Sequence, residues 1–119
     1  MPASARRYAE PHPTTDPATA VVTTAAFTIN LATKRLTTGT GQEVRLTPTE
    51  WQLLEILVRH PDKLIGHRRL LHDVWGPNYD NETNYLRVHF ANLRRKIEPD
   101  PSRPRYLITE PGIGYRFTP

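Results

Sequence analysis

The amino-acid sequence predicts an α+β fold in which a small antiparallel sheet, three helices and a closing hairpin follow one another. Three observations predict this order. β-branched and alternating apolar residues occupy positions 21–46, and apolar residues with helical spacing occupy three segments between positions 47 and 97. Two short apolar runs flank a glycine-containing turn near the C-terminus. The 119 residues have the length of one ordinary domain.

Residues 1–20 are expected to be a disordered tail or interdomain linker, because four prolines stand there among Ala, Thr and Ser without an apolar pattern. The folded domain is expected over residues 21–119. At its start, Phe27, Ile29 and Leu31 alternate with polar residues, which is typical of a half-buried strand. The Gly39–Gly41 segment is a turn signal. We therefore expect strands that are joined by local hairpins.

The first helix has a clear start in the sequence Thr47-Pro48-Thr49-Glu50, which is a capping box with proline at the first helical position. Apolar residues at helical spacing follow, and Pro61 predicts that the helix ends near Arg59 or His60. A short connector that includes Ile65 is expected to lead into the next helix, with one strand pairing on the way.

The second helix is expected over His67–Trp75, because Gly76-Pro77 is a typical helix end. The third is expected from about Glu82 to Ile97. Strands at 106–109 and 115–117 enclose the turn 110–114. Two helices joined through a loop have the order of a helix-turn-helix, and a hairpin after the second of them is a wing. The predicted fold is therefore a winged helix-turn-helix.

The third helix carries different residues on its two sides. At 100° per residue, one face is apolar and belongs to the core; it consists of Leu86, Phe90, Leu93 and Ile97. The opposite side has small or polar residues, and Arg87 and Arg94 share one flank. Small residues let a helix approach base edges in the major groove of DNA, where arginines reach guanine or phosphate. A solvated basic helix face is the alternative interpretation.

The excess positive charge is confined to the last third of the chain. Sixteen Lys and Arg against twelve Asp and Glu give a net charge of +4. Residues 83–119 hold seven basic and three acidic groups, so 7 − 3 = +4 and the rest of the chain is neutral. This asymmetry favours a polyanionic partner, with nucleic acid first. Many soluble domains nevertheless carry such a charge and bind nothing anionic.

Several function classes lack the residues that they need. The chain has no cysteine, its five histidines lack metal-site spacing, and its only serines, Ser4 and Ser102, are implausible nucleophiles. We therefore expect no enzyme activity, no catalytic residue, no metal and no cofactor. No apolar run approaches about 18 residues and no signal peptide is evident, so no membrane partner is expected. The lack of cysteine is consistent with a reducing cytoplasm.

Four motifs stand in an order that resembles a known family: Leu46–Leu54, Leu70–Gly76, Val88–Ile97 and Gly112–Phe117. Over residues 21–118, the chain resembles the winged-helix effector domain of the OmpR/PhoB family of bacterial response regulators. Within that family it is similar to the regulators of potassium-transport genes. The segments that carry this finer resemblance are Trp75–Pro77, Asn84–Val88 and Asp100–Gly112.

The resemblance implies sequence-specific binding to double-stranded DNA and transcriptional regulation. The helix at 82–97 would enter the major groove, and the 106–117 hairpin would be the wing. The implied contacts include bases for Arg87 and Arg94 and a phosphate for Trp75. The full set of implied DNA-binding residues is Arg87, Arg94, Asn84, Tyr85, Val88, Ala91, Asn92, Arg95, Trp75, Thr109, Gly112 and Arg116. Some relatives have an arginine in the wing where this chain has Pro111.

The resemblance also implies partners. Two monomers would bind tandem half-sites, and the free domain would be monomeric. The loop Pro77, Asn78, Tyr79, Asp80 and Asn81 matches a segment that contacts RNA polymerase in some relatives. A sensor histidine kinase would phosphorylate the receiver domain of a cytoplasmic parent protein, and that receiver domain is absent from these 119 residues. The alternative function is a winged-helix module that binds protein or RNA without sequence-specific DNA binding.

Overall fold

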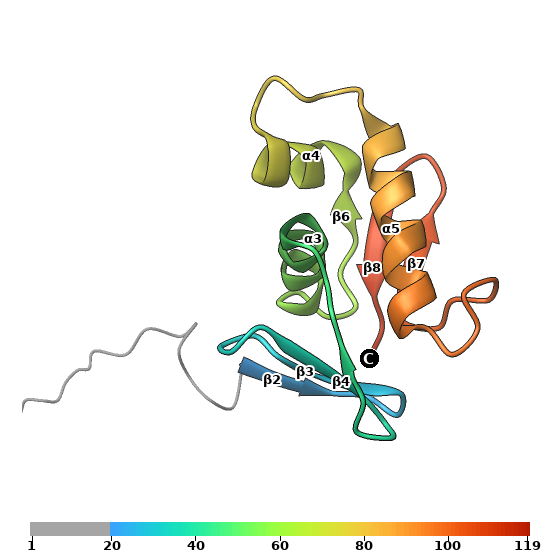
Figure 1. Ribbon diagram of the computed structural model, residues 1–119. Helices are drawn as coiled ribbons and strands as arrows, with labels where there is room; N and C mark the ends of the chain where they lie inside the picture. The colour runs from blue at the N-terminus through green and yellow to red at the C-terminus, as the bar shows by residue number, and fades with distance from the viewer. Residues whose placement is uncertain (1–19) are drawn as a thin grey trace, which may run out of the picture. The chain divides into compact units, whose positions relative to one another are not determined.

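The structure is a computed structural model, and it describes residues 20–119. The expected tail at residues 1–20 therefore lies outside the described residues except for Ala20, which is buried. The chain divides into two compact units, of which the first ends at Glu43 and the second begins at Val44. Figure 1 shows the strands of the first unit in blue to cyan and the helices and hairpin of the second in green to red.

The first unit contains the predicted meander of short strands. The sheet has the order β2 (Val21–Thr23), β3 (Phe27–Asn30), β4 (Arg35–Thr38) and β5 (Glu43–Val44), and the last strand ends at the first residue of the second unit. β2 pairs antiparallel with β3, and β3 pairs antiparallel with β4. Ile29, on the inner strand β3, is fully buried, as the alternating pattern predicts. The prediction of an antiparallel sheet built from local hairpins is thus confirmed.

The three predicted helices are present in the second unit: α3 (Pro48–Val58), α4 (His67–Trp75) and α5 (Thr83–Ile97). The capping box forms as expected. The Glu50 amide donates to the Thr47 hydroxyl at 3.1 Å, and the Thr47 amide donates to the Glu50 carboxylate at 2.9 Å. α4 ends at Gly76, whose positive φ of 117° suits glycine.

A three-stranded sheet completes the second unit. Its strands are β6 (Ile65–Gly66), β7 (Leu107–Glu110) and β8 (Gly114–Phe117), and their order is β6-β8-β7. β8 pairs antiparallel with both neighbours, so the connector before α4 does supply one strand. In Figure 1 the β7–β8 hairpin lies beside α5. The winged helix-turn-helix and its α+β class are confirmed.

The apolar face of α5 is the centre of the second unit's core. Its four predicted residues, Leu86, Phe90, Leu93 and Ile97, are all buried. Phe90 also stacks on Tyr115 of β8, with the ring centroids 4.0 Å apart. Because this face is committed to the core, the rotation of α5 about its axis is set, and the opposite side must face outward.

No helix among residues 20–119 is long and apolar enough to cross a membrane. The same residues contain no group of three or more His, Cys, Asp or Glu that could hold a metal ion.

Candidate nucleic-acid interface

The outward side of α5 is a continuous surface of small, polar and basic side chains. Asn84, Arg87 and Arg95 are exposed, and the side chains of Tyr85 and Val88 are 41% and 49% exposed. Ala91 and Asn92 are partly exposed along the same helix. The structure therefore brings the seven predicted residues of this helix side together on one accessible surface, which we call the α5 outer face.

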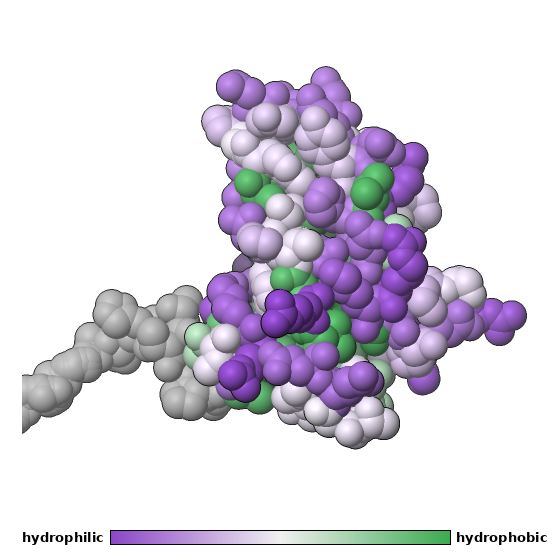
Figure 2. All heavy atoms as spheres, viewed as in Figure 1, coloured by the Kyte–Doolittle hydropathy of each residue, from purple (hydrophilic) through white to green (hydrophobic). Residues whose placement is uncertain are grey.

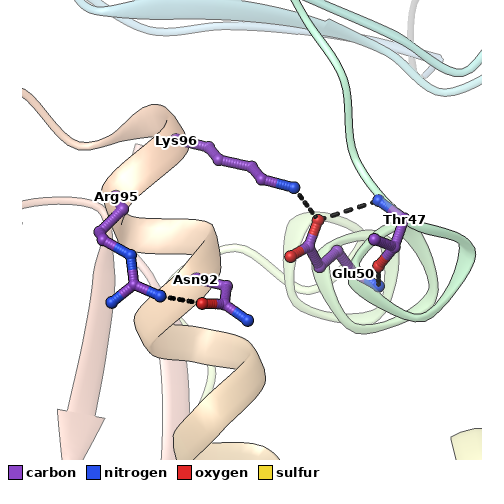
Figure 3. A network of polar contacts seen from close by, with 5 residues as sticks. All are labelled: Thr47, Glu50, Asn92, Arg95 and Lys96. Atoms are coloured by element: carbon purple, nitrogen blue, oxygen red, sulfur yellow. Dashed lines mark hydrogen bonds and ion pairs between the residues drawn. The ribbon is translucent and has the colours of Figure 1, made fainter.

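The basic side chains of α5 differ in what they already bind. Lys96 reaches to α3, where its ammonium lies 2.7 Å from the carboxylate of Glu50, a residue only 2% exposed (Figure 3). Arg95 points to another side and donates to the side-chain oxygen of Asn92 (Figure 3). Arg87 makes no hydrogen bond or ion pair to any residue of the described part of the chain. Arg87 and Arg95 are thus available to an anion, whereas the ammonium of Lys96 is already paired with the carboxylate of Glu50.

Arg94 is bound by the wing. Its Nε and Nη2 both donate to the carbonyl of Leu107, at 3.0 and 2.8 Å, and Nη2 also donates to the Thr109 hydroxyl at 2.5 Å. Burial lowers the pKa of Arg94, while the nearby Tyr115 and Glu98 act in the opposite direction. A base contact by Arg94, as expected from the resemblance, would compete with these wing contacts.

A recess of about 510 Å³ lies between the N-terminal half of α5 and the wing. Its lining residues are His67, Thr83, Arg87, Thr109, Pro111, Gly112 and Tyr115. Burial raises the pKa of Tyr115, and Arg94 and then Arg87 lower it by their positive charge. Arg87, Thr109 and Gly112 were expected from the sequence to bind DNA, and the structure brings them together here.

His67, Thr83 and Tyr115 were missed as site residues by sequence reasoning. Tyr115 belongs to the Gly112–Phe117 motif, so the motif was a signal that its ring could serve the site as well as the core. His67 is the first residue of α4. It lies beside the wing because β6, directly before it, pairs with β8, and this partner is not visible in the sequence around His67. No sequence signal pointed to Thr83.

The turn of the wing is fastened to the start of α4. The amide of His67 donates to the carbonyl of Ile113 at 3.0 Å. A Cβ on Gly114 would lie 2.0 Å from the carbonyl oxygen of Ile65, so only glycine permits this approach. Gly112, at the tip, has a positive φ of 76°. The wing therefore has a defined position relative to β6 and the start of α4.

Arg116 does not join the α5 outer face. Its Nη2 donates to the carboxylate of Glu110 on the neighbouring strand, and its Nε is buried without a partner among the described residues. The carboxylate offsets the positive charge that the sequence assigned to the wing.

Aromatic rings connect the end of α4 to the start of α5. Trp75 lies 5.5 Å from Tyr85 and 5.4 Å from His89, and Tyr79 of the intervening loop lies 6.2 Å from Tyr85, all measured between ring centroids. Trp75 is partly exposed, and its indole N–H has no hydrogen-bond acceptor within residues 20–119. The donor is thus available to a phosphate, as the resemblance implies.

The loop between α4 and α5 is anchored to α4 through Asp80. The carboxylate of Asp80 bonds to the Nε2 of His72 and lies 3.8 Å from the Nε of Arg68, both on α4. The other predicted loop residues, Pro77, Asn78 and Asn81, are exposed. They are accessible beside the aromatic cluster.

The view in Figure 2 shows the character of one side of the second unit. Hydrophilic residues cover most of its helices there, and apolar atoms appear in separate small patches. An interface of this composition suits a charged partner better than an apolar one.

The comparisons with known proteins agree with this geometry. Residues 41–117 match the family model described as transcriptional regulatory protein, C terminal. The chain belongs to this family. The resemblance to OmpR/PhoB-type effector domains is thereby confirmed, and a family of transcriptional regulators also agrees with the expectation that the chain is not an enzyme.

Two curated relatives share the finer resemblance. The transcriptional regulatory protein KdpE of Mycobacterium tuberculosis (strain H37Rv) is 56% identical over 97 residues, which are 82% of this chain and 42% of the relative. The KDP operon transcriptional regulatory protein KdpE of Escherichia coli (strain K12) is 48% identical over 90 residues, 76% of this chain and 40% of the relative. The chain thus spans about two-fifths of the length of these relatives.

A solved structure shares the fold. The response regulator DrrB, a Thermotoga maritima OmpR/PhoB homologue, matches with a TM-score of 0.75 and 25% identity. The match covers 84% of this chain and 45% of that protein.

Proposed function

We propose that the chain binds double-stranded DNA sequence-specifically as the effector domain of a two-component response regulator. α5 would lie in the major groove, and the β7–β8 wing would follow the neighbouring minor groove. The observation that carries the proposal is the α5 outer face. It is accessible along the whole helix, small at its centre, and flanked by a wing whose position is set, in a chain that belongs to a family of transcriptional regulators.

The chemistry of the face supports two kinds of contact. Val88 and Ala91 keep the centre of the helix close to the base edges, and the unpaired guanidinium of Arg87 can donate twice to guanine. Because the wing binds Arg94, we assign direct base readout to Arg87. Arg95 and the indole of Trp75 would bind phosphates and set the register, as phosphate contacts do in protein–DNA complexes generally.

The remaining predicted residues extend this assignment. Asn84, Tyr85 and Asn92 would line the groove or the flanking phosphates. Thr109 and Gly112 would approach the backbone from the wing. We assign Arg116 a weaker electrostatic role, since Glu110 is its partner.

The names of the relatives support a target. Because the two similar KdpE proteins carry the names of transcriptional regulators, one of them of the KDP operon, we propose regulation of potassium-transport genes. We further propose that the parent protein is phosphorylated by a sensor histidine kinase. Two otherwise monomeric copies would occupy tandem half-sites, and the accessible loop Pro77–Asn81 would meet RNA polymerase.

Fluorescence anisotropy tests the proposal. Three probes are titrated over a salt series: a tandem-repeat duplex from upstream of potassium-transport genes, a scrambled duplex and a single-stranded RNA. We expect tighter binding to the tandem duplex and a negative slope of log affinity against log salt concentration. Equal affinity for all three would indicate only a basic patch. Preference for RNA, or no binding at moderate salt, would favour the alternative interaction module.

Two variants test the residue roles. Arg87→Ala is expected to cost about 1–3 kcal/mol on the tandem duplex and less on the scrambled one, whereas Arg95→Ala should weaken both similarly. Arg69→Ala is the matched control, because Arg69 lies on α4 beside Asp73, in a groove lined by α3, and should leave both affinities unchanged. Equal losses for Arg87→Ala on the two duplexes would reassign Arg87 to phosphate.

A further inference from the structure

The side chain of Arg94, on α5, contacts both strands of the wing. Its two hydrogen bonds to the Leu107 carbonyl and its third to Thr109 are all to β7. The centre of its guanidinium also lies 5.9 Å from the ring centroid of Tyr115 on β8. The side chain is therefore a brace between α5 and the wing, and residues 13 to 15 positions apart in the sequence are held by it.

The donors of Arg94 are largely used by this brace. An arginine has five N–H donors, and Nε and Nη2 together supply the three that face the wing. Only Nη1 makes no hydrogen bond to a residue of the described part. The planar group is bound along one edge, and a swing toward the base edges would break all three bonds.

The bond to Thr109 has a directional consequence. A hydroxyl has one donor and two acceptor positions, while a guanidinium can only donate. Thr109 must therefore accept from Arg94, and its own proton points elsewhere. Thr109 is exposed, and its hydroxyl donates to no residue within 20–119. Threonine hydroxyls that donate to phosphate oxygens are common positioning contacts on DNA.

We propose that Arg94 is a positioning residue that acts on DNA through Thr109. It holds β7 against α5 and orients the Thr109 hydroxyl to donate to a backbone phosphate beside the recess. This inference rests on the proposed DNA binding. It differs from direct base readout in two consequences: the contribution of Arg94 is the same on every DNA sequence, and it depends on the presence of Thr109.

A double-mutant cycle tests the dependence. Affinities are measured for the unmodified chain, Arg94→Ala, Thr109→Val and the double variant on the tandem and scrambled duplexes. We expect Arg94→Ala to weaken binding by a similar factor on both duplexes, about fivefold to twentyfold. The double variant should bind no more weakly than Arg94→Ala, because the two substitutions remove the same contact to DNA. The inference would be overturned if the affinity losses of the two single variants multiply in the double variant. A loss of affinity confined to the tandem duplex would also overturn it.

Conservative variants separate the hydroxyl from simple packing. Thr109→Ser keeps the hydroxyl and should bind within about twofold of the unmodified chain, whereas Thr109→Val should not. If Thr109→Ser loses as much DNA affinity as Thr109→Val, the hydroxyl does not contact DNA and the inference fails. Since Thr109 is exposed, these two variants are informative even if Arg94→Ala unfolds, which urea unfolding of each variant reveals.

The salt dependence supplies an independent readout. If Arg94 itself bound a phosphate, Arg94→Ala would reduce the salt slope by about 0.9. We expect the slope to change by less than about half of that, since the phosphate partner is a neutral hydroxyl. Failure of the unmodified chain to bind any duplex would refute the proposed function itself. Binding by the unmodified chain with independent effects of the two residues would refute only the role of Arg94.

Discussion

Glu98 fastens the C-terminal end of α5 to the start of the wing. Its side chain is buried, and its carboxylate accepts three backbone hydrogen bonds from the strand entry, from Arg105 at 2.8 Å, Tyr106 at 3.0 Å and Leu107 at 2.8 Å. We predict that Glu98→Ala lowers the free energy of unfolding, because these donors lose their acceptor while the fold keeps them away from water.

The magnitude follows from the burial of each donor. A buried donor that loses its partner costs about 1–3 kcal/mol. The bonds to Tyr106 and Leu107 are buried, whereas the bond to Arg105 is partly exposed and can be replaced by water. Two buried donors predict a loss of about 2–6 kcal/mol. That is a large share of the roughly 5–15 kcal/mol by which native domains are stable.

The geometry also predicts the effect of a milder change. One carboxylate oxygen, Oε2, accepts from both Tyr106 and Leu107, and Oε1 accepts from Arg105. Glu98→Gln can therefore keep its carbonyl oxygen at the two buried donors and turn its amide group toward Arg105. We expect a loss of about 1–3 kcal/mol, smaller than that of Glu98→Ala.

Urea unfolding followed by tryptophan fluorescence measures both variants, since Trp51 is buried in the second unit. Glu43→Ala is the control, because Glu43 is exposed and the change should stay within about 0.5 kcal/mol. The reasoning is refuted if Glu98→Ala costs less than about 1 kcal/mol, or if the alanine and glutamine variants are equally stable with unchanged denaturant dependence.

Three further predictions concern the packing around the wing and α5. Gly114→Ala should lower the free energy of unfolding by at least about 1–3 kcal/mol, because the new Cβ would lie 2.0 Å from the Ile65 carbonyl oxygen; thermal melting measures the loss, and an unchanged melting temperature would contradict it. Lys96→Met should cost about 1–3 kcal/mol in urea unfolding, since the carboxylate of Glu50 is buried but the lysine is one-third exposed, and a simultaneous Glu50→Gln should restore part of the loss. Burial raises the pKa of Tyr115 above 10.0, so the folded state holds this proton more tightly than the unfolded state. The stability that the Tyr115 proton contributes is complete below pH 10 and is lost as pH rises through the folded-state pKa. The free energy of unfolding of Tyr115→Phe should therefore fall less steeply at alkaline pH than that of the unmodified chain. Parallel profiles of unfolding free energy against pH would contradict this prediction.

Local signals made much of the fold predictable. The capping box at Thr47–Glu50 closes within four residues, so no tertiary contact is needed to specify it. Gly76 ends α4 for an equally local reason, its positive φ. The core face of α5 follows from the helical period, and its opposite side is accessible as the pattern predicts.

The roles of individual basic residues were not predictable in the same way. Arg87 and Arg94 stand seven residues apart and share a flank of α5, so helical spacing treats them alike. In the structure, Arg87 is unpaired at the edge of the recess, whereas Arg94 is bound by β7. The difference arises because β7 brings a carbonyl and a hydroxyl within hydrogen-bond distance of Arg94, whereas Arg87 has no hydrogen-bond acceptor among the described residues.

Local sequence patterns were sufficient to predict the elements, their order, and the side of α5 that faces outward. Which positive charges remain for an anionic partner depends on contacts between elements that are distant in the sequence. Lys96 finds Glu50 across 46 positions of sequence, and Arg94 finds Thr109 across 15. A charged side chain binds the acceptor that packing brings within about 3 Å, and periodicity carries no information about acceptors on distant elements. The excess of +4 is a property of the chain. Its availability at Arg87 and Arg95 is a property of the fold.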